Sequence, residues 1–251
     1  MEPELKNRFL KLWEQYFGKA ELPITFYYTD TPVGAEPAGK PAGWQCFIGE
    51  LARVRKGQSL SFSEESIGCG GGKRYLGYSS KPRPGFEYFL SCGNAEIEGE
   101  RYKQTPELVE DFLRNAPVME PHGKNIVFKR WDKLTKDDRP EVVIFFASPD
   151  VLSALYTLSN FDRRDLNGVI APFGAGCATI IQYPLMEAAK EEPRSVMGMF
   201  DISARPFVPE NRITMAMPFQ RFKKIAGFME ESFLITESWR KVKKRITRQK
   251  P

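Results

Sequence analysis

The chain of 251 residues has few of the side chains that most catalytic and metal sites use, with one histidine and four cysteines. A Cys–His dyad would have to use His122, and Pro121-His122-Gly123 is typical of a structural turn. The cysteines form no Cys-x-x-Cys pair, which is the spacing that structural zinc sites normally show. The sequence therefore disfavours a structural zinc site.

The chain also lacks a long hydrophobic segment. Its longest strongly apolar run, Val142 to Ala147, is far too short to span a bilayer. The acidic start Met1-Glu2-Pro3-Glu4 does not have the charged and then apolar form of a signal peptide. We therefore predict a cytoplasmic protein with no membrane partner, whose cysteines are free, catalytic or metal-bound rather than paired in disulfides.

Positive charge is in excess only at the C-terminus. The net charge is +5, but residues 240–251 contain seven Lys or Arg and no acid, so the remainder is slightly acidic. A basic end of this kind is more often a solvated helix end than a patch for nucleic acid or membrane. The composition therefore disfavours a nucleic-acid partner.

Hydrophobic periodicity predicts alternating helices and strands. The expected helices are 5–17, 44–54, 106–114 (with Thr105 as N-cap), 148–159, 184–190, 219–227 and 236–246. The expected strands are 24–29, 59–63, 125–131, 141–147, 168–173, 196–202 and 213–217. We predict an α/β (or α+β) fold, with residues 1–239 forming a single domain of a mixed sheet flanked by helices and residues 240–251 a basic tail.

The first candidate site is the glycine-rich segment around Cys69, in Gly68-Cys69-Gly70-Gly71-Gly72-Lys73. Repeated glycines allow backbone amides to converge on an anion, a sulfide or a phosphate, and Lys73 and Arg74 would strengthen such a site. We therefore select Gly68, Gly70, Gly71, Lys73 and Arg74 as candidate cofactor-binding residues. The spacing is not that of a P-loop, and a flexible turn is the alternative interpretation. The whole segment 68–85 is predicted to be an irregular loop.

Cys46 is predicted near the start of a helix. At 100° per residue it points away from the apolar stripe centred near Leu51, and a helix N-terminus lowers a thiol pKa. Both features favour a nucleophile or metal ligand. A partly buried structural cysteine is the alternative.

Cys177 and Cys92 also lie beside glycine. Gly176-Cys177 follows a predicted strand, where open α/β sheets place ligands, although residues 178–183 are rich in β-formers and leave the start of the next helix open. Cys92 precedes Gly93, which is typical of a helix end and disfavours a thiolate. Cys46, Cys69, Cys92 and Cys177 are the candidate metal ligands, with Gly176 as a further candidate cofactor-binding residue.

These stretches resemble a prokaryotic family known as domain of unknown function 169. The resemblance rests on Gln45-Cys46 with Ala52-Arg53, on Gly68 to Gly71 with Leu76-Gly77, and on Pro172 to Thr179. It covers most of the chain, up to about Trp239, and implies a bacterial or archaeal single-domain α/β protein. It supplies no catalytic residue.

Three functions remain open on the sequence alone. The leading hypothesis is a cofactor-binding protein whose glycine-flanked cysteines hold an iron–sulfur cluster or a related soft metal and serve a redox partner. The second is an enzyme that uses Cys69 or Cys177 as a nucleophile on a small anionic substrate. The third is a non-catalytic small-molecule-binding protein.

Overall fold

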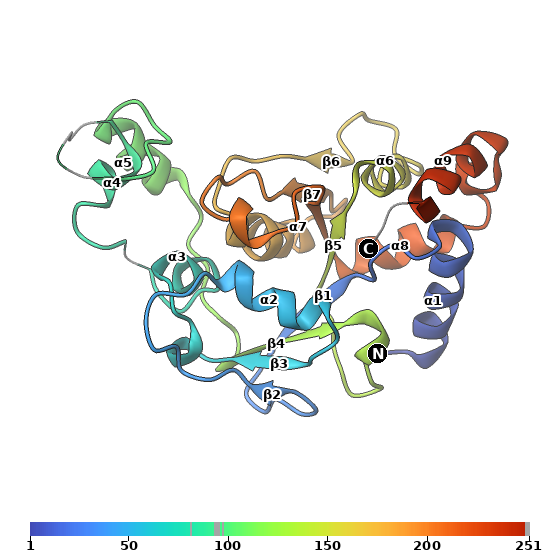
Figure 1. Cartoon of the computed structure of the whole chain (residues 1–251), viewed down its shortest axis with the longest axis horizontal. Helices are drawn as coiled ribbons and strands as arrows, with labels where there is room; N and C mark the ends of the chain where they lie inside the picture. Colours follow the sequence, from blue (N-terminus) through green and yellow to red (C-terminus); the bar gives the residue numbers. More distant parts are fainter. Residues whose placement is uncertain (81, 93–95, 97, 249–251) are drawn as a thin grey trace.

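The computed structural model describes residues 1–248 except 81, 93–95 and 97 (Figure 1). Within these residues eight strands form one sheet in the order β2-β3-β4-β1-β5-β8-β7-β6. The strands are β1 Ile24–Thr29, β2 Glu36–Pro37, β3 Leu60–Phe62, β4 Asn125–Arg130, β5 Val142–Ala147, β6 Val169–Ile170, β7 Ser195–Gly198 and β8 Ile213–Pro218. Neighbouring strands are antiparallel, except for the parallel pairs β2–β3 and β6–β7 at the two edges.

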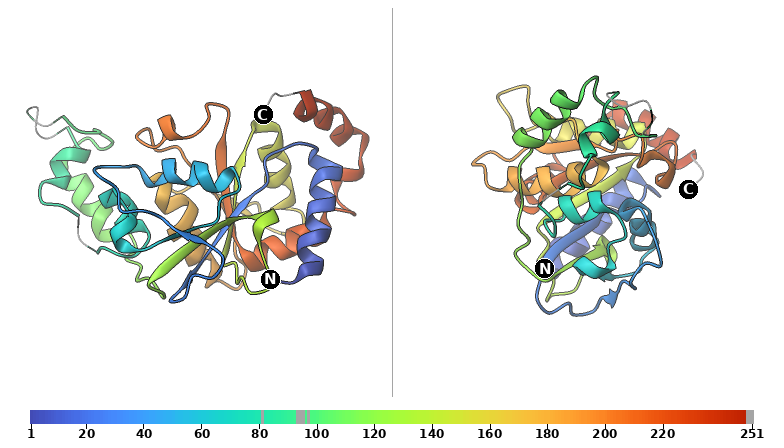
Figure 2. Two further views of the ribbon diagram at one scale, coloured as in Figure 1. Left: turned by 60° about the horizontal axis from the view of Figure 1, so that its bottom comes forward. Right: turned by 90° about the vertical axis from the view of Figure 1, so that its left-hand side faces the viewer.

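Most helices of the described residues flank this sheet (Figure 1), which confirms the predicted α/β class. The helices are α1 Pro3–Phe17, α2 Phe47–Arg55, α3 Gly70–Tyr75, α4 Phe86–Leu90, α5 Pro106–Asn115, α6 Pro149–Leu158, α7 Tyr183–Ala188, α8 Phe219–Phe228 and α9 Glu237–Arg248. Figures 1 and 2 show α1, α8 and α9 together at one end of the molecule and α4 with α5 at the other.

One apolar cluster is buried on each face of the sheet, and β5 contributes side chains to both clusters. Val142, Ile144 and Phe146 belong to a first cluster with α2 and α3, whereas the alternate residues of β5 belong to a second cluster with α1, α6, α8 and α9. A strand covered on both faces has to be apolar throughout, which explains the run that the sequence shows there. Cys46, Cys69 and Cys177 lie on the first face.

Most predicted elements are present, and the exceptions lie near the cysteines. The predicted cap of α5 is confirmed, since Thr105 Oγ1 accepts a hydrogen bond from the Leu108 amide at 3.4 Å. The prediction of an irregular loop at 68–85 was wrong for residues 70–75, which form α3. A further short helix, α4, follows this segment at Phe86–Leu90. Strands 168–173 and 196–202 are shorter than predicted, because the chain leaves the sheet after Ile170 and after Gly198.

The predicted basic tail begins inside α9. Trp239 and Ile246 are buried in the second cluster, and the Trp239 indole donates a hydrogen bond to the Tyr16 carbonyl at 2.9 Å. Arg245 pairs with Asp150 of α6 at 3.1 Å. The helix therefore packs on the sheet domain through its apolar side and carries its basic residues outward.

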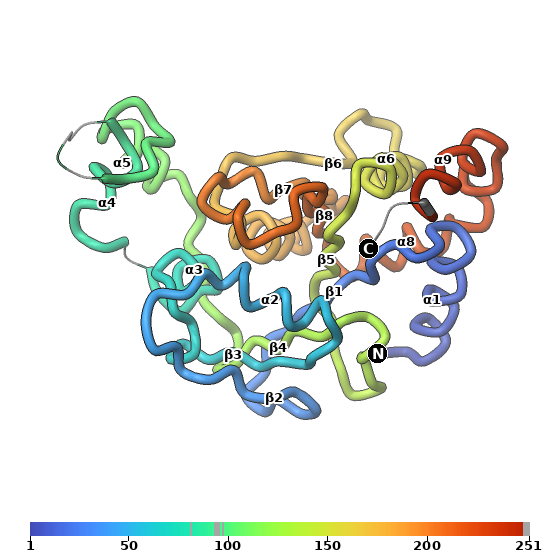
Figure 3. The backbone as a smooth tube through the Cα atoms, in the orientation of Figure 1, coloured from blue at the N-terminus to red at the C-terminus, as the bar shows by residue number. Residues whose placement is uncertain are grey.

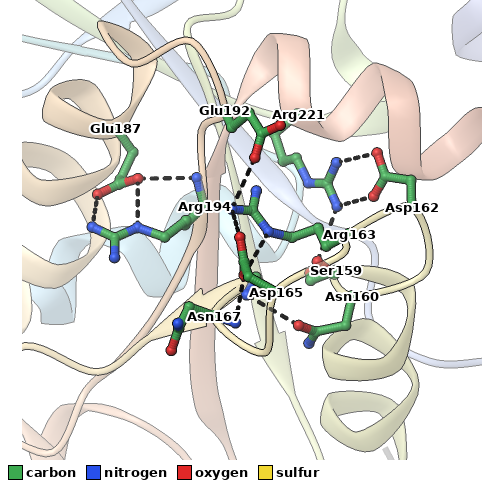
Figure 4. Close-up of polar contacts among 11 residues, drawn as sticks. Ser159, Asn160, Asp162, Arg163, Asp165, Asn167, Glu187, Glu192, Arg194 and Arg221 are labelled. Atoms are coloured by element: carbon green, nitrogen blue, oxygen red, sulfur yellow. Dashed lines mark hydrogen bonds and ion pairs between the residues drawn. The ribbon is translucent and has the colours of Figure 1, made fainter.

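A network of polar side chains lies beside β6, the strand at one edge of the sheet (Figure 4). Arg221 of α8 makes two hydrogen bonds to Asp162, at 2.7 and 2.6 Å. Glu187 of α7 accepts from both the side chain and the backbone of Arg194, just before β7. These contacts fix the chain just after α6 and just after α7, ahead of β6 and β7.

Candidate cysteine site

Cys46 is the N-cap residue of α2, half-buried and packed against the first apolar cluster. The helix begins at Phe47 and not at Trp44, so extrapolating the helical wheel to Cys46 gave the wrong direction. Burial raises the pKa of the Cys46 thiol, and the backbone amides of Gly49 and Ile48 oppose this rise. The thiol is protonated at neutral pH and has amide dipoles close to its sulfur.

Cys69 is the N-cap residue of α3, and its sulfur accepts a hydrogen bond from the Gly72 amide at 3.2 Å. The preceding residue explains why this segment approaches Cys46. A Cβ at Gly68 would lie 3.0 Å from the backbone nitrogen of Gln45, so a larger residue would push the two segments apart. Gly70 and Gly71 are exposed, with open space where a Cβ would lie.

Cys177 belongs to the same cluster and is only 7% exposed. A π-helical segment, Ala178–Gln182, begins directly after it and continues into α7, which settles the alternative left open by the sequence. Burial raises the pKa of the Cys177 thiol well above its usual value. The segment that holds Cys177 packs against α3, which carries Cys69.

Three of the four cysteines share one neighbourhood. Negative charge on Cys69 or Cys46 would further raise the pKa of Cys177, and charge on Cys69 would raise that of Cys46. All three cysteines pack in the first apolar cluster, Gly68 lies against the Gln45 backbone, and α3 contacts the segment that follows Cys177. The fold thus brings together Cys46, Cys69 and Cys177 from three distant parts of the chain.

Cys92 is placed differently. It is exposed and follows α4, which packs on α5 at the far end of the molecule (Figure 1). It does not contribute to the pKa shifts of Cys46 and Cys177 among the described interactions. Gly93, the predicted helix end, lies outside the described residues.

The predicted cations lie on α3, next to Cys69. Lys73 and Arg74 are both half-buried. The Arg74 guanidinium donates to the Ser80 carbonyl, and the Lys73 carbonyl accepts from the amides of Tyr78 and Ser79. Arg74 therefore fastens the segment that follows α3.

Sequence reasoning missed two residues beside the site, Met199 and Asp201, because it placed both in a strand. Met199 is fully buried and has φ of 67°, a left-handed conformation that costs a non-glycine residue about 1–2 kcal/mol. Its sulfur packs so closely on Gly176 that a Cβ there would lie 2.8 Å away. The strained turn directs the chain back over the Cys177 loop, where Asp201 Oδ2 accepts from the Gly176 amide at 3.0 Å. Nothing in the residue pattern marks this turn.

The loop after β7 runs beside α2 (Figure 3). Phe207 of this loop lies against Gly49 of α2, where an added Cβ would meet its ring at 3.1 Å. The Trp44 ring is 6.1 Å from the Phe207 ring, and Trp44 is 71% exposed. Phe207 therefore lies against the first turn of α2, the helix that Cys46 caps.

His122 belongs to another part of the molecule. Its Nε2 lies 2.8 Å from Glu141 Oε2, and its ring packs on Tyr28 at 4.5 Å. It borders a shallow hollow of about 640 Å³ together with Asp30, Glu64, Glu65 and Lys124. No cysteine is among its described partners, so the structure gives no Cys–His dyad in the part of the chain it describes.

The described residues contain no set of three His, Cys, Asp or Glu side chains close enough to hold a single metal ion. None of the described helices is long and apolar enough to cross a membrane.

A comparison with protein-family models gives a match over most of the chain. The model of the family described as Uncharacterised ArCR, domain of unknown function 169, matches residues 16–227, which include all four cysteines. The comparisons with curated proteins and with solved structures each returned no match. The chain therefore belongs to the uncharacterised ArCR family.

Proposed function

We propose that this protein carries an iron–sulfur cluster, or a related soft-metal centre, on Cys46, Cys69 and Cys177. The observation that supports the proposal is the convergence of these three thiols on one face of the sheet. Cysteine thiolates are the usual ligands of such clusters. A centre of this kind requires reduced thiols, so the proposal includes a cytoplasmic location.

The surroundings of the sulfurs suit a cluster. The Gly72 amide donates to Cys69, and the amides of Gly49 and Ile48 act on Cys46. Hydrogen bonds to cluster sulfurs tune the reduction potential of such centres. The open space at Gly70 and Gly71 leaves room beside Cys69.

The proposed centre is a cluster and not a single ion. A cluster of several irons separates its ligand sulfurs further than one ion does, and the described residues offer no three-donor set for one ion. Burial keeps the thiols of Cys46 and Cys177 protonated in the free protein. Binding would therefore release protons, as it does whenever a thiol becomes a ligand.

A thiol nucleophile is the second candidate, and the Gly72 amide that donates to Cys69 favours it. The half-buried Cys69 with the exposed amides of Gly70 and Gly71 would face a small anionic substrate, with Lys73 nearby. The raised pKa values of Cys46 and Cys177 weigh against either of these two as the nucleophile.

Single cysteine variants test the proposal. Protein purified without oxygen is assayed for iron and acid-labile sulfide, in the wild type and in C46A, C69A, C177A and C92A. We expect the first three to lose most of the iron and the visible absorption together, and C92A to retain both. Circular dichroism of each variant separates loss of the centre from loss of the fold.

Two results would contradict the proposal. The first is a colourless, iron-free wild type, and the second is equal iron in all four variants. In the first case, rapid alkylation of Cys69 alone by iodoacetamide near neutral pH would support the nucleophile, and slow alkylation throughout would support a plain binding protein.

A further inference from the structure

Cys46 and Cys69 stand at the starts of two helices that pack on the same apolar cluster. Cys46 is the N-cap residue of α2 and Cys69 is the N-cap residue of α3. Both thiols are free and half-buried. A disulfide between two cysteines requires Cα atoms no further apart than about 7 Å, so the contacts between the two segments decide whether these thiols can react with each other.

The residues directly before the two cysteines are in contact. An added Cβ at Gly68 would lie 3.0 Å from both the backbone nitrogen and the Cβ of Gln45. The absence of a side chain at Gly68 therefore lets the chain that leads to Cys69 run at van der Waals distance from the chain that leads to Cys46.

The contacts continue after the cysteines. An added Cβ at Gly72 of α3 would lie 3.1 Å from Phe47 Cβ and 2.9 Å from Cys69 Sγ, so these two atoms lie on either side of one point. The Gly72 amide fixes the Cys69 sulfur there through its hydrogen bond of 3.2 Å. Phe47 is the first residue of α2 and directly follows Cys46. Cys46 therefore lies between two residues that pack on the segment of Cys69.

The other two cysteines are placed less favourably for such a reaction. Cys177 is only 7% exposed, so a small oxidant from solvent reaches the half-buried thiols of Cys46 and Cys69 more readily. Cys92 is exposed, but it follows α4 at the far end of the molecule.

We propose that Cys46 and Cys69 form an oxidative modification site, a reversible disulfide that a small hydroperoxide produces, with the two thiols kept within reach of each other by the close contacts of Gly68 and Gly72. One sulfur attacks the O–O bond of the peroxide, keeps one oxygen as a sulfenic acid and releases water or an alcohol. The other sulfur then attacks the first, the S–O bond breaks, and the oxygen leaves as water with the thiol proton. The peroxide has gained two electrons from the thiol pair, and a dithiol reductant returns them to the disulfide.

This inference goes beyond the cluster proposed above and does not require it, because the reaction takes place in metal-free protein. Disulfides in reducing compartments are usually transient and redox-sensing. The disulfide would also occupy two of the proposed cluster ligands, so it would oppose loading of the centre in oxidised protein.

The test treats metal-free protein, prepared with a chelator, with hydrogen peroxide. Unreduced peptides are then mapped by mass spectrometry. We expect a Cys46–Cys69 link in the wild type, C92A and C177A, which dithiothreitol removes, and no such link in C46A or C69A. Circular dichroism shows whether each variant is folded.

A glycine variant tests the geometry with all cysteines retained. G68A adds a Cβ against Gln45 and pushes the two segments apart, so the disulfide should form several-fold more slowly than in G71A, which adds a Cβ in open space. Urea unfolding of both variants shows whether each retains the fold.

The inference is overturned if peroxide leaves Cys46 and Cys69 unlinked in the wild type, if it links either of them to Cys177 instead, or if G68A and G71A react at equal rates. Iron content tests the cluster separately. Iron-binding protein whose metal-free form gives no link would overturn only this inference, and iron-free protein that gives the link would overturn only the proposed cluster.

Discussion

Gly71 and Gly72 are neighbours in α3, but their surroundings differ. A Cβ at Gly72 would lie 2.8 Å from Ile67 Cγ2, 2.9 Å from Cys69 Sγ and 3.1 Å from Phe47 Cβ, whereas a Cβ at Gly71 would meet no atom within 4 Å. The sequence marks both as permissive glycines. Close packing requires glycine at position 72 and not at position 71.

Alanine at these two positions should therefore have opposite effects. We expect G72A to destabilise the protein by about 1–3 kcal/mol, because it forces apart α2, Ile67 and Cys69. G71A should be neutral or stabilising by up to about 1 kcal/mol, since alanine has the higher helix propensity. Urea unfolding of both variants measures the difference, and equal stabilities would show that α3 does not pack as described.

At the scale of the elements, the polar network at the edge of the sheet joins α7 to β7 (Figure 4). Glu187 is buried, which by itself would raise its pKa, but hydrogen bonds from Arg194 and Lys190 outweigh burial and lower the pKa to about 2. Because the folded pKa lies below the unfolded value, this contribution to stability is complete above pH 4.5 and is lost as the pH falls toward 2.

Replacing Glu187 should thus have an effect that depends on pH. We expect E187Q to lower the free energy of unfolding by about 2–4 kcal/mol at pH 7. The difference in the free energy of unfolding between E187Q and the wild type should decrease steadily below pH 4.5. D165N, which changes the exposed partner of Arg163, should destabilise the protein less than E187Q does. If the difference in the free energy of unfolding between E187Q and the wild type stays constant down to pH 2.5, packing and not charge accounts for the lost stability.

The elements that the sequence predicts best are those with the simplest environments. β1, β5 and β8 are apolar strands in the middle of the sheet, and their predicted bounds agree closely with the structure. α3 was missed because three glycines begin it, and glycine has low helix propensity. Tertiary contacts of Gly72 override that propensity.

At the scale of the whole molecule, the sequence could name the cysteines but could not show which of them meet. Cys46, Cys69 and Cys92 are equally spaced along the chain, yet the fold gathers the first two with Cys177 and leaves Cys92 exposed near α4. Chain topology decides this grouping, and no local pattern encodes it. Asp201 was hidden for the same reason, since its role depends on the turn at Met199.

The C-terminal helix gives a further prediction at this scale. Ile246 is buried in the second cluster, so I246A should destabilise the whole domain by about 2–4 kcal/mol in one cooperative transition. I235A changes a side chain that is 53% exposed and should have a much smaller effect. Calorimetry of both variants tests this, and a stability unaffected by I246A would mean that α9 is a dispensable tail.

The central claim is that the three gathered cysteines hold a cluster. The most direct test is the iron and acid-labile sulfide content of wild-type protein purified without oxygen, together with its visible absorption spectrum. The account predicts brown protein that contains both elements and loses its colour on oxidation. Colourless protein without iron, before and after incubation with ferrous iron and sulfide under reducing conditions, would contradict it.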